Sequence, residues 1–541
     1  MELIFYNGRI VTADPASPAA GAVAVNNGRI YAVGDEKEVL NLKNAETGLI
    51  DLRGRTLLPG FNDSHLHLIG YALTAAKVDL RHCAGIEDVV DAVSSFVEER
   101  GVKEGDWVLG WGWNQGLFAE KRMPDRTDLD RAAPANPLSI MRTCCHICVA
   151  NTPALEKAGI ARRPQPVEGG SIETDAGGRP TGVLKEQAMQ KVMDLIPPLD
   201  TGGLKELIKT AARDFLAAGL TSVQTDDLAA LGSAKLGELL DAYRELEAEG
   251  NLPLRINIQP LLLSPDELGG FLDTGLRTGS GSDFLKIGPL KLLTDGSMGG
   301  RTALLAAPYA DNPDNCGVAV LSPAEINELV TAAHSSGMQV AAHAIGDQAI
   351  NMVLDAYEKA NCLHPRQDPR FRIVHASMVS PESLERFASM GVIADIQPSF
   401  IASDHGLVDQ VFGPERAGWT YRWKDFLEKG IVMGGGSDCP VENYNPLEGI
   451  CAAVTRQDKN GNPPEGWFPG QRLTLDEAIE IYTTGSAYCS YEEKVKGTIT
   501  CGKMADLVVL SDDIYTVDPL KIKDIRVDMT VVNGRIAFRR E

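Results

Sequence analysis

The middle of the chain alternates short apolar runs with longer stretches that have the apolar spacing of helices. Eight of these runs end near residues 65–67, 221–224, 256–259, 290–293, 340–343, 373–375, 393–396 and 431–434. Apolar runs of this length, separated by helical stretches, are typical of buried parallel strands joined by crossover helices. Eight such units predict an α/β fold, a (β/α)8 TIM barrel.

Both chain ends have a different pattern, in which Asn-Gly pairs such as Asn7-Gly8 and Asn533-Gly534 lie between short apolar runs. Asn-Gly in this setting is a strong hairpin signal. We therefore expect a small β-sandwich built from residues 1–58 plus 497–541, with the barrel over residues 59–496. The first gap between strands is much longer than the others, which predicts a subdomain inserted after strand 1 at about residues 70–215.

Composition and charge narrow the choice of partners and compartment. The 541-residue chain is 44% hydrophobic and 23% charged, with a formal net charge of −22. This charge argues against a nucleic-acid or anionic-membrane partner, because no excess of cations is available to meet phosphates. No segment approaches the roughly 20 apolar residues that span a bilayer, and no signal peptide is visible. Ten cysteines do not make a disulfide scaffold in a chain of this length, and we expect a cytoplasmic protein.

The strongest local signal is the pair His65 and His67 in Pro59-Gly60-Phe61-Asn62-Asp63-Ser64-His65-Leu66-His67. Side chains two apart on a strand point the same way, so the two imidazoles can converge on one ion. Imidazole suits zinc and related divalent metals. An isolated His-x-His is as often a pair in a polar turn, but this pair closes the apolar run that opens the predicted barrel.

Three further candidate ligands follow other predicted strands. His343 ends the run Val340-Ala341-Ala342, His375 ends Arg372-Ile373-Val374, and Asp438 follows Met433-Gly434-Gly435-Gly436-Ser437. The carboxyl ends of the strands are where barrel enzymes place their active sites. A lone histidine there is more often structural. Four of the nine histidines together with an aspartate on one face are harder to explain in that way.

Lys291 needs a separate argument, because a protonated lysine has only donors and cannot bind a metal. A neutral amine could react with carbon dioxide and give an anionic carbamate that bridges two ions. The sequence alone favours an ordinary charged residue near the barrel rim, and Lys286 is the main competitor for any role.

These residues together resemble the amidohydrolase superfamily. The pattern is Gly60-Phe61-x-Asp63-x-His65-x-His67, Lys291, His343, His375 and Gly436-Ser437-Asp438. Finer details resemble its YtcJ-like branch, which includes N-substituted formamide deformylases. These details are Asp295-Gly296-Ser297, Arg301-Thr302-Ala303, Gln397-Pro398, Gly110-Trp111-Gly112-Trp113, and His146 before Asn151.

The resemblance implies a role for each metal-site residue. His65 and His67 would bind the more buried metal ion, and His343 and His375 the more exposed one. Lys291, as a carbamate, would bridge the two ions, and Asp438 would contact the metal and the nucleophilic water. The expected cofactor is one or two divalent metal ions, with zinc as the default and manganese, iron or cobalt as alternatives. A homodimer is an expectation at the level of the family.

Candidate substrate contacts are His146, Asp295, Arg301 and Trp113. A rim salt bridge is an equally good interpretation of Arg301, and core packing of the inserted subdomain is a slightly better one for the tryptophans. The cluster Cys144-Cys145-His146-Ile147-Cys148 departs from the family's usual residues. Its spacing is wrong for a zinc knuckle, which favours small buried thiols beside one pocket histidine.

The function predicted from these residues is hydrolysis of a carbon–nitrogen bond in a small molecule, first an N-substituted amide or formamide. Asp438 would act as general base toward a metal-bound water and then as general acid toward the leaving nitrogen. The same site could serve a lactone, carbamate, cyclic imide or phosphoester. A non-catalytic metal-binding scaffold is a third hypothesis, which predicts that Asp438→Asn leaves function intact.

Overall fold

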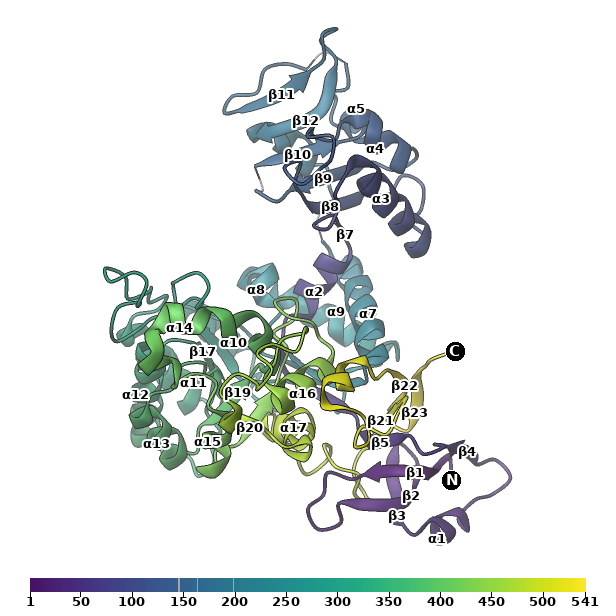
Figure 1. The fold of residues 1–541 in the computed structure, drawn as a ribbon, viewed down its shortest axis with the longest axis vertical. Coiled ribbons are helices and arrows are strands. Elements are labelled where there is room, and N and C mark those ends of the chain that lie inside the picture. The colour runs from purple at the N-terminus through teal and green to yellow at the C-terminus, as the bar shows by residue number, and fades with distance from the viewer. Residues whose placement is uncertain (145, 163, 198) are drawn as a thin grey trace. The chain divides into compact units, whose positions relative to one another are not determined.

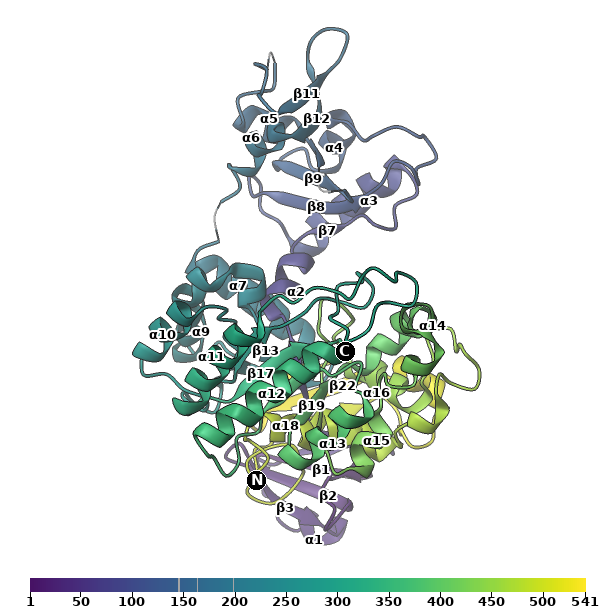
Figure 2. The same ribbon diagram turned by 90° about the vertical axis from the view of Figure 1, so that its left-hand side faces the viewer.

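The computed structural model describes residues 1–144, 146–162, 164–197 and 199–541. The chain divides into two compact units (Figures 1 and 2). The first consists of residues 1–71 and 204–541, and the second of residues 72–203.

The first unit contains nine short parallel strands in two sheets. The first sheet has the order β15-β14-β13-β6, and the second β16-β17-β18-β19-β20. Their bounds are β6 (Phe61–Leu66), β13 (Leu220–Thr225), β14 (Arg255–Ile258), β15 (Leu285–Ile287), β16 (Leu290–Leu293), β17 (Val340–Ala344), β18 (Arg372–His375), β19 (Ile393–Ile396) and β20 (Met433–Gly435). These strands coincide with the eight expected runs. Gly288 and Pro289 interrupt the fourth run between β15 and β16, where the proline has no N–H to donate.

Backbone hydrogen bonds join the two sheets at both of their outer edges. Beyond β20, Asp438 N donates to His65 O over 2.9 Å, and His67 N donates to Cys439 O over 2.8 Å. Beside β14, Lys291 N donates to Pro260 O over 2.9 Å. Hydrogen bonds therefore connect the two sheets at two places, and at one of them Leu261 and Lys291 form a parallel bridge.

Helices alternate with these strands and lie outside them, as α10, α11 and α12 do in Figure 2. The longer ones are α7 (Thr201–Ala217), α9 (Leu236–Ala248), α10 (Pro265–Asp273), α11 (Pro323–Ser335), α12 (Asp347–Leu363), α13 (Pro381–Met390), α14 (Ile401–Ala417) and α16 (Pro446–Thr455). Helix α11 illustrates the local signals, because the Ser322 hydroxyl caps its first turn, Pro323 occupies the first position and Glu325 completes a capping box. Within the described part of the chain, no helix has the length and apolar content to cross a membrane.

Strands from both chain ends form one eight-stranded sheet, in the order β23-β22-β21-β5-β1-β2-β3 with β4 paired to β1. Their bounds are β1 (Leu3–Val11), β2 (Ala19–Asn26), β3 (Arg29–Gly34), β4 (Gly48–Asp51), β5 (Thr56–Pro59), β21 (Leu507–Leu510), β22 (Val527–Val532) and β23 (Arg535–Arg539). Strand β21 runs antiparallel to β5, so the C-terminal strands continue the N-terminal ones (Figure 1). Phe5, Val23, Leu57, Leu507 and Val531 are among the residues of their shared core.

The second unit is built on a six-stranded sheet in the order β11-β12-β10-β9-β8-β7. Its strands are β7 (Val78–Asp79), β8 (Val108–Trp113), β9 (Leu138–Arg142), β10 (Ile147–Ala150), β11 (Gly170–Thr174) and β12 (Pro180–Glu186), and its main helices are α3 (Ile86–Arg100), α4 (Arg126–Ala132) and α5 (Thr152–Lys157). It ends at residue 203 rather than near 215, because residues 204–217 of α7 pack with the first unit.

A buried group of charges connects β15 to the segment after α18 (Ser486–Cys489). Lys286 Nζ lies 2.8 Å from Glu492 Oε1, and Lys496 Nζ lies 2.6 Å from Glu492 Oε2. Burial opposes ionisation of this carboxyl, but the two ammonium groups outweigh burial and lower the pKa of Glu492 to about 2. Lys286, the competitor of Lys291 in the sequence, is thus part of a structural ion-pair group.

We expect Glu492→Gln to lower the free energy of unfolding by about 3–5 kcal/mol at pH 7, because the buried ammonium group of Lys496 and the partly buried one of Lys286 lose their carboxylate. The folded pKa of Glu492 lies below its ordinary value of 4.5. Its contribution is therefore complete above that value and disappears as the pH falls toward 2. Denaturant unfolding of both proteins at pH 7 and at pH values below 4.5 checks this. The exposed control Glu382→Gln should change little, and a pH-independent difference for Glu492→Gln would contradict the assignment.

Candidate metal centre

A cavity of about 290 Å³ lies at the carboxyl ends of the parallel strands. Six of the ten residues that the sequence singles out line it: His65, His67, Lys291, His343, His375 and Asp438. The strand ends therefore bring together every candidate metal ligand. The four candidate substrate contacts do not line this cavity.

The closest cluster within the cavity consists of His65, His67 and Asp438. Asp438 Oδ1 lies 3.4 Å from His65 Nε2 and 3.1 Å from His67 Nε2. Among the described residues, the potential ligand atoms of these three side chains lie within 4.8 Å of one another. The ring of His375 continues the cluster, with its centroid 5.9 Å from that of His65 and 4.5 Å from that of His343.

The backbone around this cluster explains two features of the sequence. Gly436 lies so close to β6 that a Cβ atom would come within 2.8 Å of His65 N, so a glycine is required there. His375 and Asp438 both have positive φ angles, 73° and 56°, although neither is a glycine. Such conformations cost about 1–3 kcal/mol each and occur mostly at functional sites.

Electrostatics in the cavity favour one anion beside one protonated imidazole. Burial opposes the charge on Asp438, yet the imidazoles of His65 and His67 beside it hold the pKa of its carboxyl well below the usual range, and His67 Nε2 is within hydrogen-bond distance of Oδ1 at 3.1 Å. Burial also lowers the pKa values of His65 and His375. For His67, contact with Asp438 outweighs burial and raises the pKa to about 9. The proton between His67 and Asp438 lies between two potential metal ligands. Both must be deprotonated to bind a metal, so a divalent cation could replace this proton.

Each of the four histidines has one ring nitrogen engaged outside the cluster. The acceptors on Nδ1 are Gln259 Oε1 for His65 (3.0 Å), Asp226 O for His67 (2.7 Å) and Gln397 Oε1 for His375 (2.7 Å). For His343 the engaged nitrogen is Nε2, which lies 3.1 Å from Gly296 O. Three imidazoles thus offer Nε2 to the cavity and His343 offers Nδ1. Together with the Asp438 carboxylate, this donor set fits zinc or a related divalent metal.

Lys291 is buried and lies beside Asp226, a residue that the sequence analysis missed. The Lys291 ammonium is 3.7 Å from Asp226 Oδ2, and the side chains are 3% and 2% exposed. Asp226 follows the last residue of β13 directly. The signal that could have revealed it is the same one that identified the histidines, a polar residue immediately after a predicted core strand.

Asp295, one of the expected substrate contacts, is hydrogen-bonded to backbone groups of the protein. It is fully buried, and it accepts hydrogen bonds from Leu304 N (2.9 Å), Ile345 N (3.1 Å) and Gly346 N (2.9 Å). Its Oδ1 atom also lies 3.3 Å from His343 Nε2. Asp295 therefore holds the loop after β16 against the turn after β17.

Arg301 forms a salt bridge and Trp113 packs in a core, which are the alternatives to substrate contact given above for these two residues. The Arg301 guanidinium lies 2.7 Å from Asp311 Oδ2 and donates to Gly299 O, which makes it part of a loop salt bridge. The Trp113 ring is fully buried in the core of the second unit and donates to Ile140 O over 3.1 Å, which fits the alternative of core packing.

His146 and its neighbouring thiols lie in the second unit. The His146 imidazole is 67% exposed and 3.0 Å from Glu186, whose carboxylate raises the pKa of the histidine. Cys144 is half-buried, Cys148 is buried, and both are free thiols. Cys145 lies outside the described residues. In the part of the chain that the structure describes, neither thiol belongs to a group that could hold a metal.

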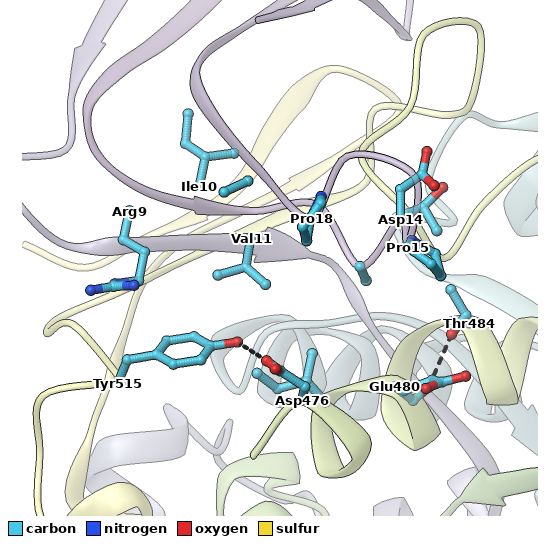
Figure 3. A pocket seen from close by; sticks show the side chains of 14 residues that line it. Arg9, Ile10, Val11, Asp14, Pro15, Pro18, Asp476, Glu480, Thr484 and Tyr515 are labelled. Carbon is cyan, nitrogen blue, oxygen red and sulfur yellow. Dashed lines mark hydrogen bonds between the residues drawn. The ribbon is translucent and has the colours of Figure 1, made fainter. Parts of the chain in front are cut away.

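A larger cavity of about 540 Å³ lies between β1 and the residues from Asp476 to Thr484 (Figure 3). Its polar groups are partly paired, because the Tyr515 hydroxyl donates to Asp476 and the Arg9 guanidinium lies 2.8 Å from Asp513. Its lining, within the described residues, includes no histidine or cysteine. Size alone therefore does not identify the candidate metal centre, because the smaller cavity is the one lined by histidines.

Comparisons with known proteins agree with this geometry. Residues 48–538 match the amidohydrolase family. The chain is 35% identical to the putative amidohydrolase YtcJ of Bacillus subtilis, covering 100% of both chains, and 30% identical to an N-substituted formamide deformylase of Arthrobacter pascens, covering 100% of this chain and 98% of the relative. An uncharacterized metal-dependent hydrolase from Pyrococcus furiosus has a similar structure, with a TM-score of 0.73 and 32% identity, covering 96% of this chain and 100% of the other. This chain belongs to the amidohydrolase family, which confirms the resemblance seen in the sequence.

We expect Asp295→Asn to lower the free energy of unfolding by about 1–3 kcal/mol, because the amide group would place a donor against buried backbone N–H groups. Denaturant unfolding measures the loss. Asp311→Asn, at the exposed loop salt bridge, is the matched control and should cost less than about 1 kcal/mol. Full stability of the Asp295→Asn protein would contradict the structural role of this carboxylate.

Proposed function

We propose that this amidohydrolase is a metal-dependent hydrolase that cleaves a carbon–nitrogen bond of a small molecule, first an N-substituted amide or formamide. The observation that supports this most is the convergence of His65, His67, His343, His375 and Asp438 on one cavity. The Arthrobacter pascens relative is named for the deformylation of N-substituted formamides, which supports the choice of bond. The acidic net charge of −22 favours a small molecule over nucleic acid or a membrane surface.

The same proposal includes the architecture that presents the site. We regard the two parallel sheets as one (β/α)8 barrel, with a composite sandwich built from the chain ends. A homodimer remains the proposed assembly.

His65, His67 and Asp438 would hold the first divalent ion, and His343 and His375 a second. Lys291, as a carbamate, would bridge them, and zinc is the first choice. When bound, such an ion lowers the pKa of a water from about 15.7 to around 7 and polarises a carbonyl oxygen. The imidazoles fit this role because burial keeps His65 and His375 neutral.

Asp438 is the residue that would move protons. Its carboxyl stays ionised at neutral pH because the imidazoles of His65 and His67 lie beside it, with His67 Nε2 hydrogen-bonded to its Oδ1 atom. It can therefore orient a water, accept its proton and deliver that proton to the leaving nitrogen. The left-handed backbone at Asp438 holds the carboxylate against the two imidazoles.

The rest of the cavity wall is mainly apolar and would receive the substituent of the substrate. Leu261, Leu293, Ile345, Phe400 and Val441 line it. The Phe400 ring lies parallel to His375, with centroids 5.8 Å apart. These side chains would exclude water from the reacting bond and favour an apolar, uncharged group.

Other bonds are compatible with the same residues. A lactone, carbamate, cyclic imide or phosphoester could meet the same polarising groups, so a substrate panel has to separate them. A metal-binding scaffold without catalysis is the contrasting hypothesis.

The panel should contain N-substituted formamides and amides, lactones and phosphotriesters. We expect the formamides or amides to be hydrolysed, and Asp438→Asn to lower kcat/KM by about 10²–10⁴-fold with its metal retained, because the proton acceptor is lost. Asp311→Asn is the control and should keep wild-type activity. Hydrolysis confined to lactones or phosphotriesters would reject the proposed bond, and an Asp438→Asn protein of full function would favour the scaffold.

Bound metal per chain, measured by elemental mass spectrometry on protein purified without chelator or added metal, tests the centre itself. Two ions are expected if Lys291 forms the bridging carbamate. One ion would keep the hydrolase and remove Lys291 from the centre. Failure to bind any ion, even after reconstitution, would reject the mechanism.

A further inference from the structure

We propose that Gln259 and Gln397 are positioning residues that determine which ring nitrogen of His65 and His375 faces the cavity. The proposal deepens the metal-dependent function proposed above and rests on it. The two glutamines contact different histidines from different strands, but they do so in the same way.

Gln259 follows the last residue of β14 and is completely buried. Its Nε2 group lies 3.1 Å from Ser64 O, a carbonyl that can only accept. The amide orientation is therefore fixed, with Oε1 directed at His65 Nδ1 over 3.0 Å. Because Oε1 can only accept, Nδ1 of His65 must carry the hydrogen.

Gln397 repeats this arrangement after β19 and is 2% exposed. Its Nε2 group donates to Asp395 O over 3.2 Å, and its Oε1 atom lies 2.7 Å from His375 Nδ1. The Asp395 carbonyl thus fixes the orientation of the Gln397 amide, and the amide oxygen fixes the hydrogen of His375 on Nδ1. Both histidines are thereby held as Nδ1–H tautomers with the Nε2 lone pair directed into the cavity.

His67 and His343 provide the contrast. Each has a backbone carbonyl as a second partner, Asp226 O for His67 and Gly296 O for His343, which no side-chain substitution removes. Among these four histidines, only His65 and His375 are hydrogen-bonded to a side-chain amide. A neutral amide also adds no charge to a buried site that already contains the carboxylates of Asp226 and Asp438.

Zinc affinity, measured by competition with a chromophoric chelator, gives the first test. We expect Gln259→Leu and Gln397→Leu each to weaken binding by about 10–100-fold, the usual effect of removing a partner of a metal-binding histidine. Gln339→Leu is the matched control. Gln339 is fully buried and donates to Arg370 O (2.7 Å) and Cys489 O (2.9 Å), and its hydrogen bonds go to backbone rather than to a candidate ligand. Unchanged affinity in both test variants, or an equal loss in the control, would overturn the proposal.

A second measurement needs no metal. Nitrogen chemical shifts of ¹⁵N-histidine-labelled, metal-free wild-type protein report the tautomer of each neutral imidazole among the nine histidines. We expect Nδ1–H for His65 and His375, assigned by the signals that move in the two leucine variants and stay in Gln339→Leu. Predominant Nε2–H at either histidine would overturn the proposal.

The two readouts separate this inference from the proposed function. A protein that binds no zinc would reject the metal-dependent hydrolase. The tautomers would still be measurable, and only the Nε2–H result would then reject the role of the glutamines.

Discussion

A fully buried ion pair between Arg372 and Asp395 supports the metal centre from beneath. Arg372 lies at the start of β18 and Asp395 within β19, and neither is exposed. Such a pair costs several kcal/mol in lost hydration unless its other hydrogen-bonding atoms are satisfied. Here two of the three guanidinium nitrogens also bind other strands, because Nη1 donates to Gln224 Oε1 and Nη2 to Ser64 O, each at 2.7 Å, which connects β18 to β13 and β6; the Nε atom has no partner among the described residues. Ser64 precedes His65, so the position of the histidine pair depends on this cross-link.

Periodicity was sufficient to locate the strands, and the histidines and Asp438 were chosen as candidate ligands by their place after those strands, whereas Lys291 was chosen by the family resemblance. A residue at the carboxyl end of a buried parallel strand lies at the same end as its counterparts on every other strand. Spacing does not determine which polar side chains remain open to a ligand. Asp295 and Trp113, two expected substrate contacts, do not line the cavity; Asp295 accepts hydrogen bonds from backbone N–H groups, and Trp113 packs in a hydrophobic core. Asp226 directly follows a core strand, as the histidines end or follow theirs, but an aspartate at the start of a loop is common and did not stand out.

The limits of the inserted unit show a second constraint on such predictions. The long first gap between strands predicted a subdomain at about residues 70–215, and the second compact unit consists of residues 72–203. Its end fell inside a continuous amphipathic stretch, where α7 begins in one unit and buries Ile208, Ala212 and Phe215 in the other. Hydrophobic spacing reveals that a helix has an apolar face, but not which core receives that face.

The charges around the cavity explain why neutral amides are suitable supports for the histidines. Asp438 and Asp226 bring two carboxylates, and Lys291 brings one ammonium, all nearly buried. In many metal sites a carboxylate accepts the second hydrogen of a histidine. A carboxylate in place of Gln259 or Gln397 would add another buried anion and would also repel Ser64 O or Asp395 O, the carbonyls that each glutamine binds. An amide accepts from the imidazole and donates to the carbonyl at once, so each histidine is oriented without further charge burial.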